Sequence, residues 1–77
     1  MTIITKNRTY IFTSSPESKF LRVTGGPKEL FVTELMHIFI GENMIIKGYL
    51  IDKETNTPLT KLGIFLFTTS PVVKILS

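Results

Sequence analysis

The chain of 77 residues contains no cysteine and no tryptophan, and it has a single histidine. The absence of cysteine excludes disulfides and thiolate metal sites. One imidazole and six scattered acidic residues provide little for a metal site, so we expect no metal and no cofactor. A chain this short buries only about 60–65% of the surface that it exposes when unfolded. We therefore expect one domain over residues 1–77, stabilised by dense apolar packing or by a second subunit.

Long apolar runs are also missing. The longest are Ile38–Ile40 and Ile64–Phe67, whereas a helix that spans a bilayer needs about 20 apolar residues. The first ten residues, MTIITKNRTY, lack the apolar core of a signal peptide. These features predict no membrane contact and a cytoplasmic location.

What is present is an apolar fraction of 43% and a net charge of +3. Surplus apolar surface on a small chain is commonly covered by another subunit. The positive charge is concentrated in the first 28 residues, where Glu17 is the only acid. The basic residues of that part are Lys6, Arg8, Lys19, Arg22 and Lys28. They predict either a phosphate-binding surface or a solubilising face with lysines that protect strand edges.

A motif occurs twice, near the two ends of the chain. Residues 11–21 read IFTSSPESKFL and residues 66–76 read LFTTSPVVKIL. Each copy predicts a strand, a turn at the Ser-Pro step and a second strand. The two copies could lie side by side around a local pseudo-two-fold axis, or they could form matching edges that meet between subunits.

Strand patterns cover most of the remaining chain. Residues 2–5 and 8–13 predict a hairpin around Lys6-Asn7, where Asn7 is able to take positive φ, followed by a loop over residues 14–18. Gly25-Gly26-Pro27 ends a predicted strand over residues 19–24. The later strands are predicted at residues 44–52, with Gly48 as a bulge or a close approach, at 59–68 with both faces buried, and at 72–76.

Residues 27–40 favour a helix. Their polar residues, Glu29, Thr33, Glu34 and His37, gather on one side of a helical wheel. Pro27 and Gly41 suit the two ends of such a helix. The β-branched residues of the segment argue for the rival interpretation, a hairpin with residues 41–43 as its loop. We therefore expect an α+β fold with an antiparallel sheet of five to six strands and one helix near 27–40. The alternative is an all-β meander or small barrel.

Residues 48–59 read GYLIDKETNTPL. This segment resembles the G-x-L-x-D-x-x-T-x-x-P-L hairpin of the carboxypeptidase-regulatory, transthyretin-like β-sandwich modules. The resemblance covers a dozen residues and implies a hairpin. Asp52, and more weakly Thr55, would cap its turn by accepting backbone N–H bonds. No function is inferred from the resemblance.

Catalytic patterns are weak throughout the chain. Glu34 and His37 have a metal-ligand spacing on a helix, but the expected fold has no second helix to complete the site. The hydroxyls of the two Ser-Pro turns have no second histidine to act as a base. Gly25-Gly26 lacks the Lys-Ser/Thr of a P-loop. If a small anion binds, we expect it at the backbone of residues 26–29. We predict that the protein is not an enzyme and has no catalytic residues.

Two binding functions follow. The first is protein–protein contact by a small adaptor or inhibitor, of a kind often encoded by viruses and mobile elements, that assembles with itself as a dimer and binds an unidentified protein. Its predicted oligomer interface is the apolar terminal strand, with Val72, Val73, Ile75 and Leu76. The second is binding of single-stranded nucleic acid, with Arg8, Tyr10, Lys19, Arg22 and Lys28 as contacts. Even spacing puts Arg8 on the face of Tyr10 in the predicted strand 8–13.

Overall fold

The computed structural model describes residues 1–15 and 18–77, and nearly all of its regular structure is β-strand. Antiparallel pairing joins every neighbouring pair of strands. The elements are β1 (Thr2–Thr5), β2 (Thr9–Ser15), β3 (Ser18–Thr24), β4 (Leu30–Met36), β5 (Asn43–Asp52), β6 (Thr57–Pro58), the 3-10 turn η1 (Thr60–Leu62) and β7 (Phe65–Leu76).

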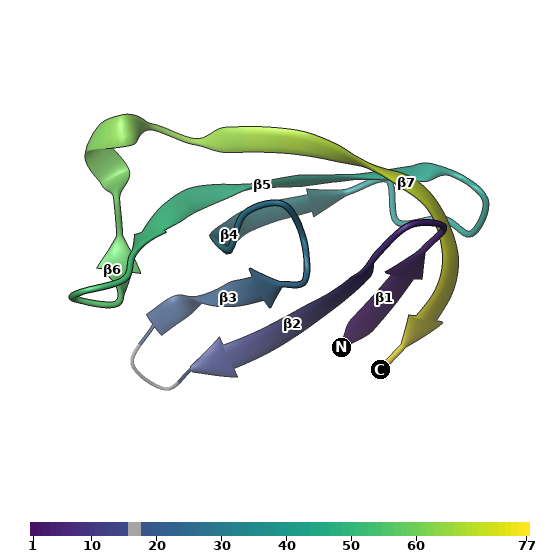
Figure 1. Cartoon of the computed structure of the whole chain (residues 1–77), viewed down its shortest axis with the longest axis horizontal. Helices are drawn as coiled ribbons and strands as arrows, with labels where there is room; N and C mark the ends of the chain where they lie inside the picture. The colour runs from purple at the N-terminus through teal and green to yellow at the C-terminus, as the bar shows by residue number, and fades with distance from the viewer. Residues whose placement is uncertain (16–17) are drawn as a thin grey trace.

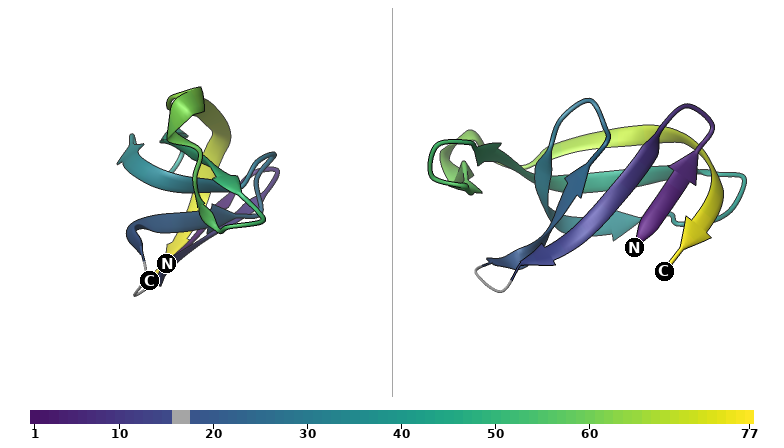
Figure 2. Two further views of the ribbon diagram at one scale, coloured as in Figure 1. Left: turned by 90° about the vertical axis from the view of Figure 1, so that its left-hand side faces the viewer. Right: turned by 60° about the horizontal axis from the view of Figure 1, so that its bottom comes forward.

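The sheet closes on itself. Its strand order is β4-β3-β2-β1-β7-β5-β6, and β4 also pairs with β5. Six strands therefore form a ring, with the two-residue β6 added outside it. Figure 1 shows β5 and β7 running side by side, and the second view of Figure 2 shows β1, β2 and β3 passing across them. The α+β prediction is wrong, and the stated alternative, an all-β fold, describes the chain.

The predicted helix over residues 27–40 contains β4 instead. β4 pairs with β3 on one edge and with β5 on the other, so it completes the ring. Leu30, Phe31 and Val32 are all buried. Leu30 and Val32 belong to the central core, whereas Phe31 faces outward between its cross-strand partners Arg22 and Tyr49. A strand covered on both faces loses the alternation that identifies strands, which is why the segment resembled an amphipathic helix.

The core fills the interior of the ring. Nine buried side chains from all six ring strands form one cluster: Ile3, Tyr10, Phe12, Val23, Leu30, Val32, Met44, Ile46 and Val72. The rings of Tyr10 and Phe67 lie 6.2 Å apart between centroids and join β2 to β7 across it. Gly48 lets β4 approach β5 closely, because a Cβ there would lie 2.3 Å from the Phe31 carbonyl oxygen. The predicted close approach at Gly48 is therefore confirmed.

The two copies of the repeated motif adopt different structures. In the first, β2 and β3 form an antiparallel pair with Ser15 opposite Ser18, and the Pro16-Glu17 part of the predicted turn lies outside the described residues. In the second, β7 continues through Pro71 as one strand that bends along its length (Figure 1), so the turn predicted there is wrong. β5 pairs with the first part of β7 and β1 with the last part, so Pro71 lies where the partner strand changes. Its carbonyl oxygen accepts the N–H of Lys6 at 3.0 Å.

The β5–β6 hairpin confirms the turn that the GYLIDKETNTPL segment predicts. Asp52 Oδ1 accepts the N–H of Glu54 at 3.0 Å, and the Asp52 carbonyl oxygen accepts the N–H of Asn56 at 2.7 Å. The Thr55 hydroxyl lies 2.6 Å from that of Thr57 and does not cap the backbone.

One other local prediction is wrong. The strand predicted from residue 59 starts only at Phe65, and Leu66 is exposed, so its two faces are not both buried.

The predicted hairpin around Lys6-Asn7 is confirmed, since β1 and β2 pair antiparallel. At the β1–β2 turn, Asn7 is not among the described residues with positive φ. The Thr5 hydroxyl holds that turn instead, because it donates to the Arg8 carbonyl at 3.0 Å and accepts the Arg8 N–H at 3.2 Å.

Candidate protein-contact surface

Exposed apolar side chains gather around the two chain termini, which lie side by side in Figure 1. Cross-strand pairing places Ile11 and Leu76 on either side of Thr2, on the same face of the sheet. The loop after β4 reaches the same region, because Ile40 forms a bridge with Val72. We call the resulting set the terminal surface: Met1, Ile11, Phe39, Ile40, Val73, Ile75 and Leu76.

The terminal surface contains three of the four residues predicted as an oligomer interface. Val73 is 57% exposed, Ile75 39% and Leu76 42%. Val72 is 1% exposed and belongs to the core, so its place in the interface is corrected. The register explains the difference: Val72 pairs with Thr5 and Lys74 with Ile4, so Val73 has no partner on β1 and lies at an irregularity of the ladder.

The last part of β7 also has an open edge. β5 pairs with β7 only as far as Pro71, and the bridge from Ile40 reaches Val72. Beyond that point, no strand within the described chain pairs with the edge of β7 that faces away from β1. Lys74 is the only charged side chain between Val72 and Leu76. Such an edge offers backbone donors and acceptors to another strand, with little charge to prevent pairing.

A second apolar group lies where the chain enters β7. Leu62, Ile64 and Leu66 are 60%, 54% and 55% exposed. They alternate with Gly63, Phe65 and Phe67, of which the two phenylalanines are partly buried against the core. The sequence did not separate the two faces, because both registers of this segment are apolar. This group has fewer exposed apolar residues than the terminal surface and lies outside it.

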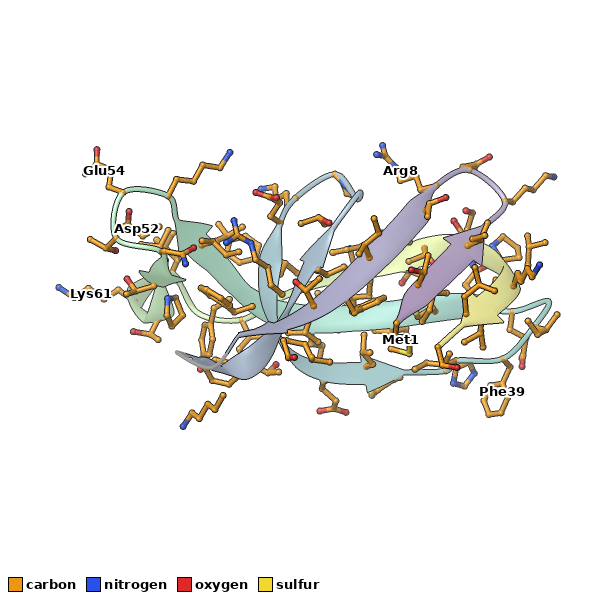
Figure 3. All side chains as sticks on the ribbon, turned by 90° about the horizontal axis from the view of Figure 1, so that it is seen from below. Met1, Arg8, Phe39, Asp52, Glu54 and Lys61 are labelled. Atoms are coloured by element: carbon orange, nitrogen blue, oxygen red, sulfur yellow. The ribbon has the colours of Figure 1, made fainter. Side chains whose placement is uncertain are left out.

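The aromatic residue among the predicted nucleic-acid contacts, Tyr10, is not on the surface with the basic residues. Tyr10 is 2% exposed, so its ring is unavailable for stacking on a base, and its predicted contact is corrected. Burial raises the pKa of its hydroxyl above 10.0, and the charge of Arg8 acts in the opposite direction. Arg8 lies in the β1–β2 turn before β2 begins (Figure 3), so strand alternation does not place it with Tyr10.

The other predicted nucleic-acid contacts are engaged locally. Arg22 donates to the Asn56 side-chain oxygen at 2.8 Å and lies 3.7 Å from Glu29. The Lys19 ammonium lies 5.4 Å from the centroid of the Phe20 ring, and that of Lys28 lies 5.2 Å from the Phe65 ring. Together with Arg8 they come from a turn, a strand and a loop. Phosphate contact through these four residues stays a prediction.

The polar groups considered for catalysis have structural roles. The His37 ring packs edge-on against Phe39, with centroids 5.7 Å apart, and the strand puts Glu34 opposite Lys47. The buried Thr69 hydroxyl accepts the Met44 N–H at 3.1 Å and donates to the Ser70 carbonyl at 2.7 Å. Within residues 1–15 and 18–77, no group of three His, Cys, Asp or Glu residues is placed to hold a metal ion.

Comparison with known proteins finds no matching family model, no matching curated protein and no matching solved structure. Among the described residues, no helix has the length and apolar character required to cross a membrane.

Proposed function

We propose that this domain is a small non-enzymatic binding module of the adaptor or inhibitor type, which acts through protein–protein contact and assembles with itself. The observation that carries the proposal is the terminal surface, where seven exposed apolar side chains adjoin an open strand edge. Exposed apolar patches of this kind are typical of protein-contact sites. The hydrogen-bonded Thr69 hydroxyl and the packing of the one imidazole against Phe39 support a non-enzymatic role.

Self-association has a specific geometry in this proposal. A two-fold axis beside β7 pairs its residues 73–76 with the same residues of a second copy, as isologous interfaces require. The pairing extends the sheet from one subunit into the other and covers Val73, Ile75 and Leu76.

The burial of Tyr10 favours protein contact over nucleic-acid binding. Tyr10 is the one aromatic residue among the predicted nucleic-acid contacts, and its buried ring cannot stack on a base.

Sedimentation equilibrium of purified protein tests the proposal. Wild-type protein should show a monomer–dimer equilibrium in the micromolar range. Val73→Lys should weaken dimerisation by about 100-fold, since an unpaired charge buried in an interface costs about 3 kcal/mol or more. Leu66→Lys is the matched control, because it makes the same change on the same strand at a similar exposure but outside the terminal surface.

Two results would reject the assembly. One is a wild-type chain that stays monomeric at high micromolar concentration. The other is a dimer that Leu66→Lys dissociates and Val73→Lys leaves intact.

A further inference from the structure

A cavity of about 370 Å³ lies between the β3–β4 loop and the end of β5, away from the terminal surface. Figure 3 shows Asp52 and Glu54 at this end of the molecule, opposite Met1 and Phe39. We call the cavity the β5 pocket. It is lined by residues 26–29 of the β3–β4 loop together with Leu50, Ile51, Lys53 and Leu59. Its volume falls at the lower end of the range for ligand sites, about 300–1,000 Å³.

Both walls of the β5 pocket are fixed by packing. On the loop side, Gly25 has a φ of 93°, and a Cβ there would lie 2.0 Å from the Thr9 carbonyl oxygen. A Cβ on Gly26 would lie 2.7 Å from the Tyr10 ring, so the loop sits directly on β2. On the other side, the N–H of Leu59 donates to the Leu50 carbonyl at 2.8 Å. The pocket is therefore preformed, which reduces the entropy that binding costs.

The floor of the pocket is apolar and its rim is basic. Leu50, Ile51 and Leu59 supply the apolar lining, and Ile51 is only 8% exposed. Lys28 and Lys53 are the two basic lining residues, and the Lys28 ammonium lies 5.2 Å from the centroid of the Phe65 ring. The only acidic lining residue, Glu29, faces Arg22 at 3.7 Å. Asp52 and Glu54 belong to the adjacent turn and do not line the pocket, although their charges weaken the field around it.

Backbone donors are also present at the rim. Among the described residues, the N–H groups of Gly26 and Lys28 donate to no other residue. An anion bound between the loop and the two lysines would satisfy both charge and hydrogen-bonding requirements. A fully hydrated anion such as phosphate would leave the apolar floor unused.

We propose that the β5 pocket binds a small carboxylate attached to an apolar group. The carboxylate lies between Lys28 and Lys53, and the apolar group contacts Leu50, Ile51 and Leu59. Two sources share this chemistry: a free organic acid, and the C-terminal residue of a peptide that ends in an apolar side chain. The proposal is independent of the terminal surface.

Titration of ¹⁵N-labelled protein, followed by amide chemical shifts, tests the site. N-acetyl-leucine should produce saturable shifts at Gly26, Lys28 and Leu59 with a millimolar dissociation constant. N-acetyl-leucinamide, which lacks the charge, and acetate, which lacks the apolar group, should each bind at least about tenfold more weakly. A short peptide with a C-terminal leucine distinguishes the sources. Tighter binding than N-acetyl-leucine identifies a peptide terminus, and weaker binding identifies a free acid.

Variants locate the carboxylate. Lys53→Gln and Lys28→Gln should each weaken N-acetyl-leucine binding by about two- to fivefold, as expected for partly exposed ion pairs. Lys6→Gln, a distant exposed lysine in the β1–β2 turn, should leave binding unchanged. Lys53→Gln is the decisive variant, because Lys28→Gln also removes the contact with Phe65. The absence of saturable shifts would overturn the proposal. So would equal affinity of the wild type for N-acetyl-leucine and N-acetyl-leucinamide, together with equal affinity of the wild type and Lys53→Gln for N-acetyl-leucine.

Discussion

Tyr10 shows how the burial of one residue changes the choice between functions. In the sequence Tyr10 lies among basic residues. A surface that binds single-stranded nucleic acid has this composition, because its aromatic rings stack on bases and its basic side chains contact phosphates. In the fold its ring points inward and meets Phe67, with centroids 6.2 Å apart. Arg8 lies in the β1–β2 turn, and its charge acts on the Tyr10 hydroxyl without an exposed Tyr10 ring beside it. The burial of Tyr10 thus removes one predicted stacking residue from the basic N-terminal third.

The buried hydroxyl of Tyr10 makes stability depend on alkaline pH. Burial raises its pKa in the folded state above the ordinary value of a tyrosine, so folding favours the protonated form. This contribution is complete below pH 10 and is lost as pH rises through the folded-state pKa. Urea unfolding of wild type and Tyr10→Phe, measured from pH 8 upwards, should show a steeper loss of stability in the wild type above about pH 10. Parallel curves for the two proteins would mean that Tyr10 ionises without affecting the fold.

β4 and β5 illustrate how closely two elements must approach for the ring to close. Gly48 lies opposite Val32, and the space that its Cβ would fill is occupied by the backbone of Phe31 and Val32. A backbone cannot move aside as a flexible side chain does. The closure of the sheet therefore depends on this glycine.

Gly48→Ala should lower the free energy of unfolding by about 1–3 kcal/mol, because the added methyl group forces β4 away from β5. Chemical denaturation monitored by tyrosine fluorescence measures the loss. Lys47→Ala, the neighbouring control, shortens an outward side chain opposite Glu34 and should cost less than about 1 kcal/mol. Equal losses for the two variants would contradict the close approach.

The sequence predicted those elements whose local pattern agrees with their surroundings. β3 and β5 show recognisable strand patterns, and Asp52 marks the β5–β6 turn by its own chemistry. β4 was missed because Phe31 is covered on the outer face by contacts that come from distant strands. The path of β7 through Pro71 was missed because it depends on pairing with two distant strands. β5 pairs with the first part of β7, and β1 pairs with the last part. Of the predicted interface residues, Val73, Ile75 and Leu76 are exposed and Val72 is not, and their contact with a second copy stays a prediction.

At the scale of the whole molecule, the closed ring separates two surfaces of different character. The molecule measures 35 × 23 × 17 Å. The terminal surface and the open edge of β7 lie at one end, and the β5 pocket lies beside the β5–β6 hairpin at the other. A dimer formed through the terminal surface would leave both pockets accessible. The arrangement suits a small module that assembles through one end and binds through the other.

The most direct test of this account is an isotope-filtered NOE experiment on a mixture of labelled and unlabelled protein, at a concentration where dimers are populated. Only contacts between subunits give signals in that experiment. The account predicts intermolecular NOEs from the side chains of Val73, Ile75 and Leu76, together with signals between Hα atoms across the paired β7 edges. Intermolecular NOEs confined to Leu62, Ile64 and Leu66, or none at any concentration, would contradict it.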